Sequence, residues 1–207
     1  MTAQSAEIAS EDTARDGKAD ARTRILDGAE RLFRHYGYTK TTVADIARDL
    51  GMSPANVYRF FPSKAAIHEA LADRMLAEIE AATWKIARLP VSAAERLRLY
   101  VTETHKATVA TMLDEAKVHE MVSVALEEQW GVIERHLDRM NAILAMIIRD
   151  GIAAGEFAKC DPDAAAKCFA ASMISVCHPQ VVAQCMAKPN RATPLELAEF
   201  ALKALKA

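Results

Sequence analysis

Apolar residues recur at helical spacing along most of this chain, and the first such stretch runs from about Asp20 to Tyr36. One face of this stretch is apolar and carries Ile25, Ala29, Leu32, Phe33 and Tyr36. Gly37 follows, and glycine suits the left-handed position that ends many helices. Residues 1–18 are polar and show no apolar period, so we expect them to form a flexible arm ahead of this helix.

The next segment, TTVADIARDLGMSPANVYRFFPSK, contains several helix start and stop signals within a short length. Thr42 can cap a helix, because Asp45 three residues later completes an acidic capping box. Gly51 can end that helix, since glycine adopts a positive φ without steric cost. The pattern therefore predicts a short helix between these two signals.

A second short helix follows after only one intervening residue. Ser53 is placed to cap it, and Pro54 suits the first helical position because its missing N–H is not needed there. Pro62 ends this helix, and Ser63 is placed to cap the next one. Two short helices joined by a tight turn, followed at once by a third helix, indicate a helix-turn-helix.

Amphipathic stretches fill the remainder of the chain and favour an all-α fold. We expect helices over about 64–88, 92–114, 116–128, 130–154 and 161–177, and a last helix after Thr193. Their inner stripes are expected to include Ile67, Leu71, Met75 and Ile79, then Ile133, Leu137, Met140, Leu144 and Ile148, and finally Leu195, Ala198, Leu202 and Leu205. Pro179 is expected to kink or break the alanine-rich helix that precedes it.

The pattern divides the chain into three parts. These are an arm over 1–18, a helix-turn-helix domain over 19–64, and a helical body over 65–207. Between Lys18 and Lys64 there are nine Lys/Arg and five Asp/Glu, whereas the body carries an excess of acidic residues. A basic head on an acidic body is compatible with phosphate contact at one end of the molecule.

Targeting signals and membrane spans are not expected from this sequence. The first twenty residues are polar and acidic, unlike a signal peptide, and no apolar run approaches the length of a membrane span. The four cysteines are spaced by 8, 9 and 8 residues, which is unlike the spacing of metal ligands. We therefore expect a cytoplasmic protein with reduced cysteines that serve as small packing residues, and no metal.

Enzyme motifs are also missing from the sequence. It contains no glycine-rich phosphate loop, no GxSxG and no HExxH. Acidic pairs such as Glu127-Glu128 are typical of a solvated helix face. We expect neither catalytic residues nor a cofactor.

With its two capped helices placed, the chain resembles the TetR family of bacterial transcriptional regulators. The resemblance is carried by ILDGAERLFRHYGY and by TTVADIARDLGMSPANVYRFFPSKAAI, and more loosely by IIRDGIAAGEF followed by DPDAAAKC. It implies a homodimer with a DNA-binding head and a helical body that binds ligand and dimerises. The recognition helix would be Pro54 to Phe60, which would enter the major groove of a double-stranded operator.

The resemblance also implies a set of DNA-contacting residues, namely Thr42, Ser53, Ala55, Asn56, Tyr58, Arg59 and Lys64. Their chemistry fits these roles, because asparagine can pair with adenine and arginine with guanine. Thr42 and Tyr58 can donate to phosphate oxygens. Simple solvation is the alternative for Arg59 and Lys64, and Asn56 could equally be a polar first-turn residue without a base contact. Family members often carry His at the position of Arg59, so the operator sequence does not transfer.

The body is expected, by the same resemblance, to bind a small hydrophobic or amphipathic effector. Candidate pocket residues are Thr104, His105, Thr108, Met140 and Met173, although ordinary core packing explains such residues equally well. Dimerisation would use the helix after Asp161 and the last helix. The expected function is a ligand-responsive regulator, most simply a repressor. The alternative is a helical small-molecule carrier or interaction bundle whose head no longer binds DNA.

Overall fold

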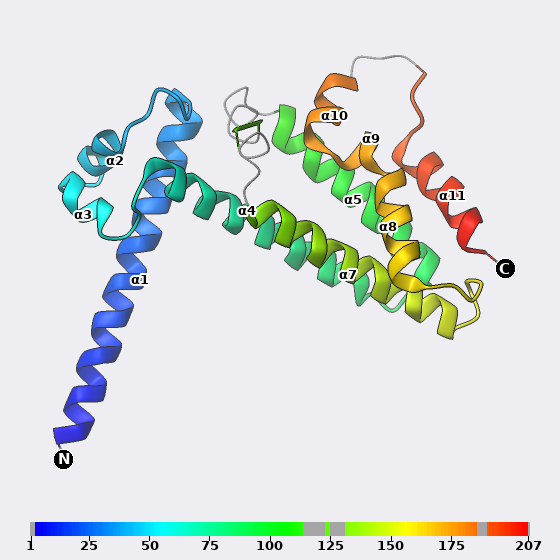
Figure 1. Ribbon diagram of the computed structural model, residues 1–207, viewed down its shortest axis with the longest axis horizontal. Helices are drawn as coiled ribbons and strands as arrows, with labels where there is room; N and C mark the ends of the chain where they lie inside the picture. Colours follow the sequence, from blue (N-terminus) through cyan, green and yellow to red (C-terminus); the bar gives the residue numbers. More distant parts are fainter. Residues whose placement is uncertain (1–2, 114–122, 125–130, 186–189, 207) are drawn as a thin grey trace. The chain divides into compact units, whose positions relative to one another are not determined.

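The computed structural model describes residues 3–113, 123–124, 131–185 and 190–206. Every regular element in this part of the chain is helical (Figure 1). The longer helices are α1 (Ala3–Tyr36), α4 (Lys64–Ala87), α5 (Ala93–Leu113), α7 (Gly131–Ala153), α8 (Pro162–Ser172) and α11 (Pro194–Leu205). The shorter helices are α2 (Val43–Asp49), α3 (Pro54–Tyr58), α9 (Ile174–Cys177) and α10 (Pro179–Cys185). The all-α prediction is confirmed.

The chain forms two compact units, Met1–Leu71 and Ala72–Ala207, and the division falls within α4. The first two turns of α4 bury Ile67 and Leu71 in the core of the first unit, where Phe33, Ile46 and Val57 are also buried. Arg31 of α1 is hydrogen-bonded to Asp49 of α2, which joins the first two helices of this unit.

The first helix differs from its prediction at both ends. It begins at Ala3 and not near Asp20, so residues 3–18 are helical. This stretch lacks an apolar stripe, but it contains no proline and many residues with good helix propensity. At the other end Tyr36 was predicted to face inward, yet it is 54% exposed. It occupies the last residue of α1, where the chain turns away at Gly37, whose φ is +92°.

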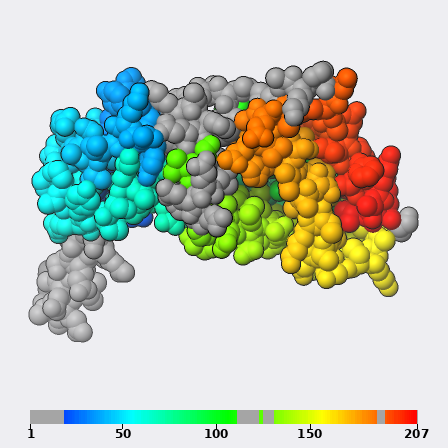
Figure 2. Space-filling view, turned by 45° about the horizontal axis from the view of Figure 1, so that its top comes forward, coloured from blue at the N-terminus to red at the C-terminus, as the bar shows by residue number. Residues whose placement is uncertain are grey.

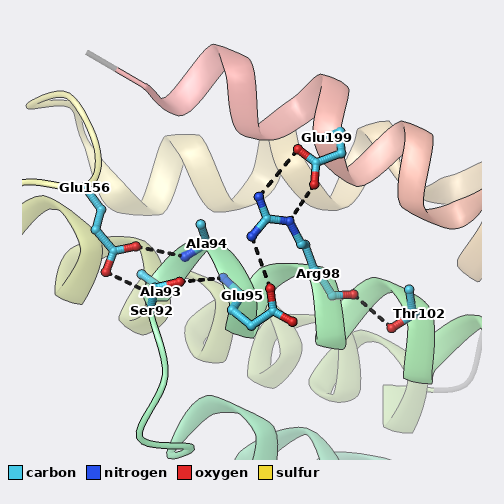
Figure 3. A network of polar contacts seen from close by, with 8 residues as sticks. All are labelled: Ser92, Ala93, Ala94, Glu95, Arg98, Thr102, Glu156 and Glu199. Carbon is cyan, nitrogen blue, oxygen red and sulfur yellow. Dashed lines mark hydrogen bonds and ion pairs between the residues drawn. The ribbon is translucent and has the colours of Figure 1, made fainter.

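The core of the second unit is built mainly from α5, α7, α8 and α11. Its largest fully buried side chains are Leu97, Ile143, Leu144, Ile147, Ile148, Met173 and Leu202. Two polar contacts fasten α5 to other elements (Figure 3). Arg98 is hydrogen-bonded to Glu199 of α11, and Glu156 accepts hydrogen bonds from the backbone amides of Ala93 and Ala94.

The predicted inner stripe of α7 is wrong in its first half. Leu137 is 55% exposed, and His136 takes the inward position next to it. His136 Nδ1 lies 2.8 Å from Glu80 Oε1 on α4, and Arg139 Nε donates to Glu80 Oε2 at 2.7 Å. The inward face of α7 therefore runs through Val132 and the largely covered His136 and rejoins the predicted stripe at Met140.

Two further helix predictions differ from the structure. The helix after Asp161 was expected to continue to Cys177, but it is interrupted at Met173, where ψ is 0°, and α9 follows. Leu195 was expected on the inner face of the last helix and is 49% exposed in its first turn. The helix predicted over 116–128 lies outside the described residues, apart from 123–124, which are helical.

Candidate nucleic-acid interface

The predicted start signals of α2 and α3 are confirmed by their hydrogen bonds. Thr42 Oγ1 accepts from the Asp45 amide at 3.2 Å, and the Asp45 carboxylate accepts from the Thr42 amide at 3.0 Å. The Asp45 carboxylate accepts hydrogen bonds from the Thr42 hydroxyl and the Thr42 backbone amide. These bonds, the hydroxyl's first, hold the pKa of Asp45 below its ordinary value. Ser53 Oγ accepts from the Asn56 amide at 3.2 Å, with Pro54 at the first helical position.

A tight turn joins the two helices. Gly51 has a φ of +65°, a conformation that other residues rarely adopt, and the Met52 amide donates to Ala47 O at 2.8 Å. On the inner side, Val57 is fully buried and Phe61 is 3% exposed. These two side chains fix the rotation of α3 against the core of the first unit.

The outer side of α3 carries most of the residues predicted to face DNA. Ser53, Ala55, Tyr58 and Arg59 are exposed, and Asn56 is half-buried. Tyr58 is 51% exposed, which is unusual for an aromatic residue next to the fully buried Val57. The helix itself is shorter than expected, because it ends at Tyr58 with Arg59 as its C-cap and not at Phe60.

Thr42 and Lys64, the other two predicted contacts, already have partners within the protein. The Thr42 side chain is exposed and donates to Asp45 Oδ2 at 2.6 Å. Lys64 is half-buried, and its Nζ donates to Tyr38 O at 2.9 Å and lies 4.2 Å from the Tyr38 ring centroid. The Tyr38 ring also lies against the ring of His68, another residue of α4, with 4.5 Å between the ring centroids. Neither Tyr38 nor His68 was singled out from the sequence. The four-residue spacing of Lys64 and His68 was the available signal, because it places both on one face of α4.

The predicted pocket residues of the body fall into two groups. His105 Nδ1 lies 2.7 Å from Val176 O, and Thr108 Oγ1 donates to Cys177 O at 3.2 Å. These two α5 side chains therefore satisfy carbonyl groups at the end of α9. Met140 and Met173 are buried in the apolar core, and Thr104 is half-buried on α5.

An open depression lies elsewhere on the second unit. Its lining among the described residues is Ser123, Gln180, Ala183 and Gln184, and it includes none of the five predicted pocket residues. The structure thus brings His105 and Thr108 together at the end of α9 without placing them in this depression.

The cysteines do not all pack as predicted. Cys160 and Cys168 are exposed, whereas Cys177 and Cys185 are half-buried, and all four are free. Burial raises the pKa of Cys177 to about 12. Within the described residues, His, Cys, Asp and Glu side chains form no group of three that could hold a metal ion. No helix in the same part of the chain is long and apolar enough to cross a membrane.

Two family models match this architecture. Residues 25–71 match the model described as bacterial regulatory proteins, tetR family, and residues 93–198 match the tetracyclin repressor-like C-terminal domain. An HTH-type transcriptional repressor of Mycobacterium tuberculosis is 44% identical over 57 residues. That match covers 28% of this chain and 30% of the mycobacterial protein.

Solved structures share the fold over almost the whole chain. A TetR/AcrR-family regulator from Thermobifida fusca is 22% identical with a TM-score of 0.60, covering 89% of this chain and 95% of the other. The repressor FadR of Thermus thermophilus, solved with lauroyl-CoA, is 17% identical with a TM-score of 0.60, covering 88% of this chain and 91% of the other. The matched families consist of transcriptional regulators and not of enzymes. Both parts of the chain therefore identify it as a member of the TetR family of bacterial transcriptional regulators.

Proposed function

We propose that this protein is a ligand-responsive transcriptional repressor that binds a pseudo-palindromic DNA operator as a homodimer in the cytoplasm. The observation that supports this most directly is the outer face of α3. This face exposes a tyrosine, an arginine, a serine and an alanine, while its inner face is anchored by the buried Val57. Such a helix can enter the major groove without disturbing the core behind it.

Each exposed side chain has a distinct proposed role. Arg59 reads guanine through two parallel hydrogen bonds, and Asn56 reads adenine in the same way. Ala55 is small enough to allow close approach to the base edges or contact with a thymine methyl group. Tyr58 and Ser53 donate to phosphate oxygens and fix the register of the head on the duplex. Thr42 donates to phosphate once its hydroxyl hydrogen turns away from Asp45 Oδ2.

The proposed dimer forms through α8 and α11, which lie side by side in the second unit (Figures 1 and 2). Phe200 of α11 is 74% exposed, although α11 buries Ala198 and Leu202 on its other side. A helix with apolar residues on two opposite sides is expected to bury one side in its own core and the other against a second protein chain. A two-fold axis at this face would present two copies of α3 to successive major grooves about 34 Å apart.

The proposed effector is a small hydrophobic or amphipathic molecule bound by the helical body. The support is the apolar, methionine-containing core of the second unit, together with the similar fold of the FadR repressor that was solved with lauroyl-CoA. Helix α4 belongs to both units, so it is the element through which an effector would change the spacing of the two heads. The effector releases DNA only if it binds the DNA-incompetent spacing more tightly.

Binding to DNA from the region upstream of the gene tests this proposal. A repressor gives a saturable footprint on a short palindrome, and an effector added afterwards lowers the affinity. Binding that is weak, fully salt-sensitive and equal for random DNA would contradict it.

A further inference from the structure

The first two turns of α4 hold the loop between α1 and α2 through a single aromatic residue. Lys64 Nζ donates to Tyr38 O at 2.9 Å and lies 4.2 Å from the centroid of the Tyr38 ring. His68, one helical turn further along α4, has its ring centroid 4.5 Å from that of Tyr38. His68 is 2% exposed, and Phe33 of α1 packs edge-on against both rings.

The carbonyl that Lys64 binds lies in the short segment that leads to α2, and hydrogen bonds within this segment hold its backbone. Tyr38 O also accepts from the Thr41 amide at 3.2 Å. Thr41 is 2% exposed, and its hydroxyl donates to Gly37 O at 2.8 Å. The next residue, Thr42, is the N-cap of α2. The position of Tyr38 therefore determines where the backbone enters α2.

We propose that Lys64 is a positioning residue for DNA binding, which orients the loop over 37–41 and the start of α2 and does not itself neutralise a phosphate. This inference rests on the proposed function as a DNA-binding regulator. An ammonium group that holds both a carbonyl and the face of an aromatic ring loses both contacts when it reaches out to a phosphate. Its replacement should act through Tyr38 and Thr42 rather than through lost charge.

The two roles of Lys64 predict different binding data. A lysine that contacts phosphate contributes equally to all DNA sequences, and its loss lowers the slope of log K against log salt by about 0.9. A positioning lysine affects the fit to the preferred site, so its loss weakens that site and leaves random DNA and the salt slope unchanged. The specificity ratio therefore separates the two roles.

The experiment uses the full-length protein and two duplexes of equal length. One is the site that the wild-type protein enriches from a random DNA library, and the other is a scrambled version of it. Lys64→Met is compared with Lys85→Met, which removes an exposed lysine from the same helix but in the second unit. We expect Lys64→Met to weaken the enriched site about tenfold, as for the loss of one charge-assisted hydrogen bond. Scrambled DNA should bind as before, and Lys85→Met should match the wild type on both duplexes.

Equal weakening of both duplexes with a lower salt slope would overturn the inference in favour of a phosphate contact. Tyr38→Leu provides a second variant, because it keeps the carbonyl but removes the ring beneath the ammonium. It should lower the preference for the enriched site in the same way. In the double variant, the loss of binding free energy should be smaller than the sum of the losses in Tyr38→Leu and Lys64→Met. A loss equal to that sum would contradict the idea that both residues act through the same contact. If Lys64→Met does not fold, Tyr38→Leu alone decides, and wild-type affinity for both duplexes would overturn the inference.

Amide hydrogen exchange distinguishes failure of this inference from failure of the proposed function, because it does not depend on DNA binding. If the wild-type protein enriches no site, the proposed function fails, and the inference is then decided by exchange of the amides over 37–42. Lys64→Met should accelerate exchange there, because the Thr41 amide is bonded to the carbonyl that Lys64 holds. Unchanged exchange in this segment would show that Lys64 does not position the loop.

Discussion

Gly151 of α7 lies directly against the ring of Phe157, in a space that leaves no room for a Cβ atom. A Cβ built at this position would fall well inside van der Waals contact with the Phe157 ring and 2.8 Å from the Ala93 Cβ. Phe157 is 4% exposed and Ala93 is fully buried, so neither has open space to move into. This close approach joins the end of α7 to the start of α5.

Gly151→Ala should therefore destabilise the protein, although glycine to alanine within a helix normally stabilises by about 1 kcal/mol. Overpacking at a buried site costs about 1–3 kcal/mol, which exceeds the gain in helix propensity. Urea unfolding followed by circular dichroism measures the difference. Gly131→Ala on the same helix is the control, since among the described residues its new Cβ would meet the tip of the flexible Arg135 side chain at 3.3 Å. A Gly151→Ala variant as stable as this control would show that the contact yields easily.

Glu156, in the segment that follows α7, caps the start of α5 and should thereby stabilise the folded protein. Its two carboxylate oxygens accept from the amides of Ala93 and Ala94 at 3.0 and 3.1 Å (Figure 3). Glu156→Ala leaves both amides without this acceptor and should lower the free energy of unfolding by about 1 kcal/mol. Glu156→Gln keeps one acceptor oxygen and should lie between the two. Thermal and urea unfolding of the three proteins would contradict the account if all three coincided.

The contact of Glu80 with His136 and Arg139 predicts a pH-dependent contribution to stability. Burial alone would raise the pKa of Glu80, but the hydrogen bonds from His136 and Arg139 together outweigh it and leave the pKa below its ordinary 4.5. Stability from a carboxyl whose pKa is lowered on folding is fully present above the unfolded pKa and is lost as pH falls through the folded pKa. Glu80→Gln should therefore be less stable than the wild type at pH 7, by about 1 kcal/mol.

The difference between wild type and Glu80→Gln should be present above the ordinary pKa of 4.5 and should shrink below it. Urea titrations at several pH values measure it. Glu103→Gln is the control, because Glu103 pairs with Lys106 on the exposed side of α5 and such pairs contribute less than about 1 kcal/mol. A difference that grew as pH fell below 4.5 would have the wrong sign for this contact.

Phe200→Asp should convert the proposed dimer into a monomer without unfolding it. The side chain is 74% exposed in the single chain, so the folded protomer tolerates a charge there, whereas a buried interface would not. Sedimentation at micromolar concentration should give twice the 22.7 kDa chain mass for the wild type and the chain mass for the variant. Leu137→Asp, which alters an exposed apolar residue of α7, should remain dimeric. Dissociation by Leu137→Asp but not by Phe200→Asp would place the interface elsewhere.

The features that sequence predicted well are local ones. The caps at Thr42 and Ser53 connect residues three positions apart, and the turn at Gly51 depends on the φ of one residue. Such signals are complete within a few residues. This explains why the helix-turn-helix, and with it the exposed face of α3, could be located before the structure was known.

The features that sequence missed depend on residues far apart in the chain. Periodicity indicated Leu137 as the inward residue of α7, but the carboxylate of Glu80 on another helix favours His136 at that place. Thr108 was interpreted as a pocket residue because it interrupts an apolar stripe, yet it bonds the end of α9, 69 residues later. A helix pattern shows which face is apolar, but it does not show which element supplies the partner.

The most direct test of the central claim is the affinity of the pure protein for its enriched DNA site across a salt series, measured with Tyr58→Ala and Arg59→Ala. Arg59→Ala should cost about 1–3 kcal/mol and relax the base preference at one position, and Tyr58→Ala should weaken the site with a smaller change in preference. Arg149→Ala, which removes an arginine of the second unit whose side chain is 58% exposed, should bind as the wild type does. Wild-type affinity for both α3 variants, or no preference of the wild type for any DNA site, would contradict the account of α3 as the recognition helix.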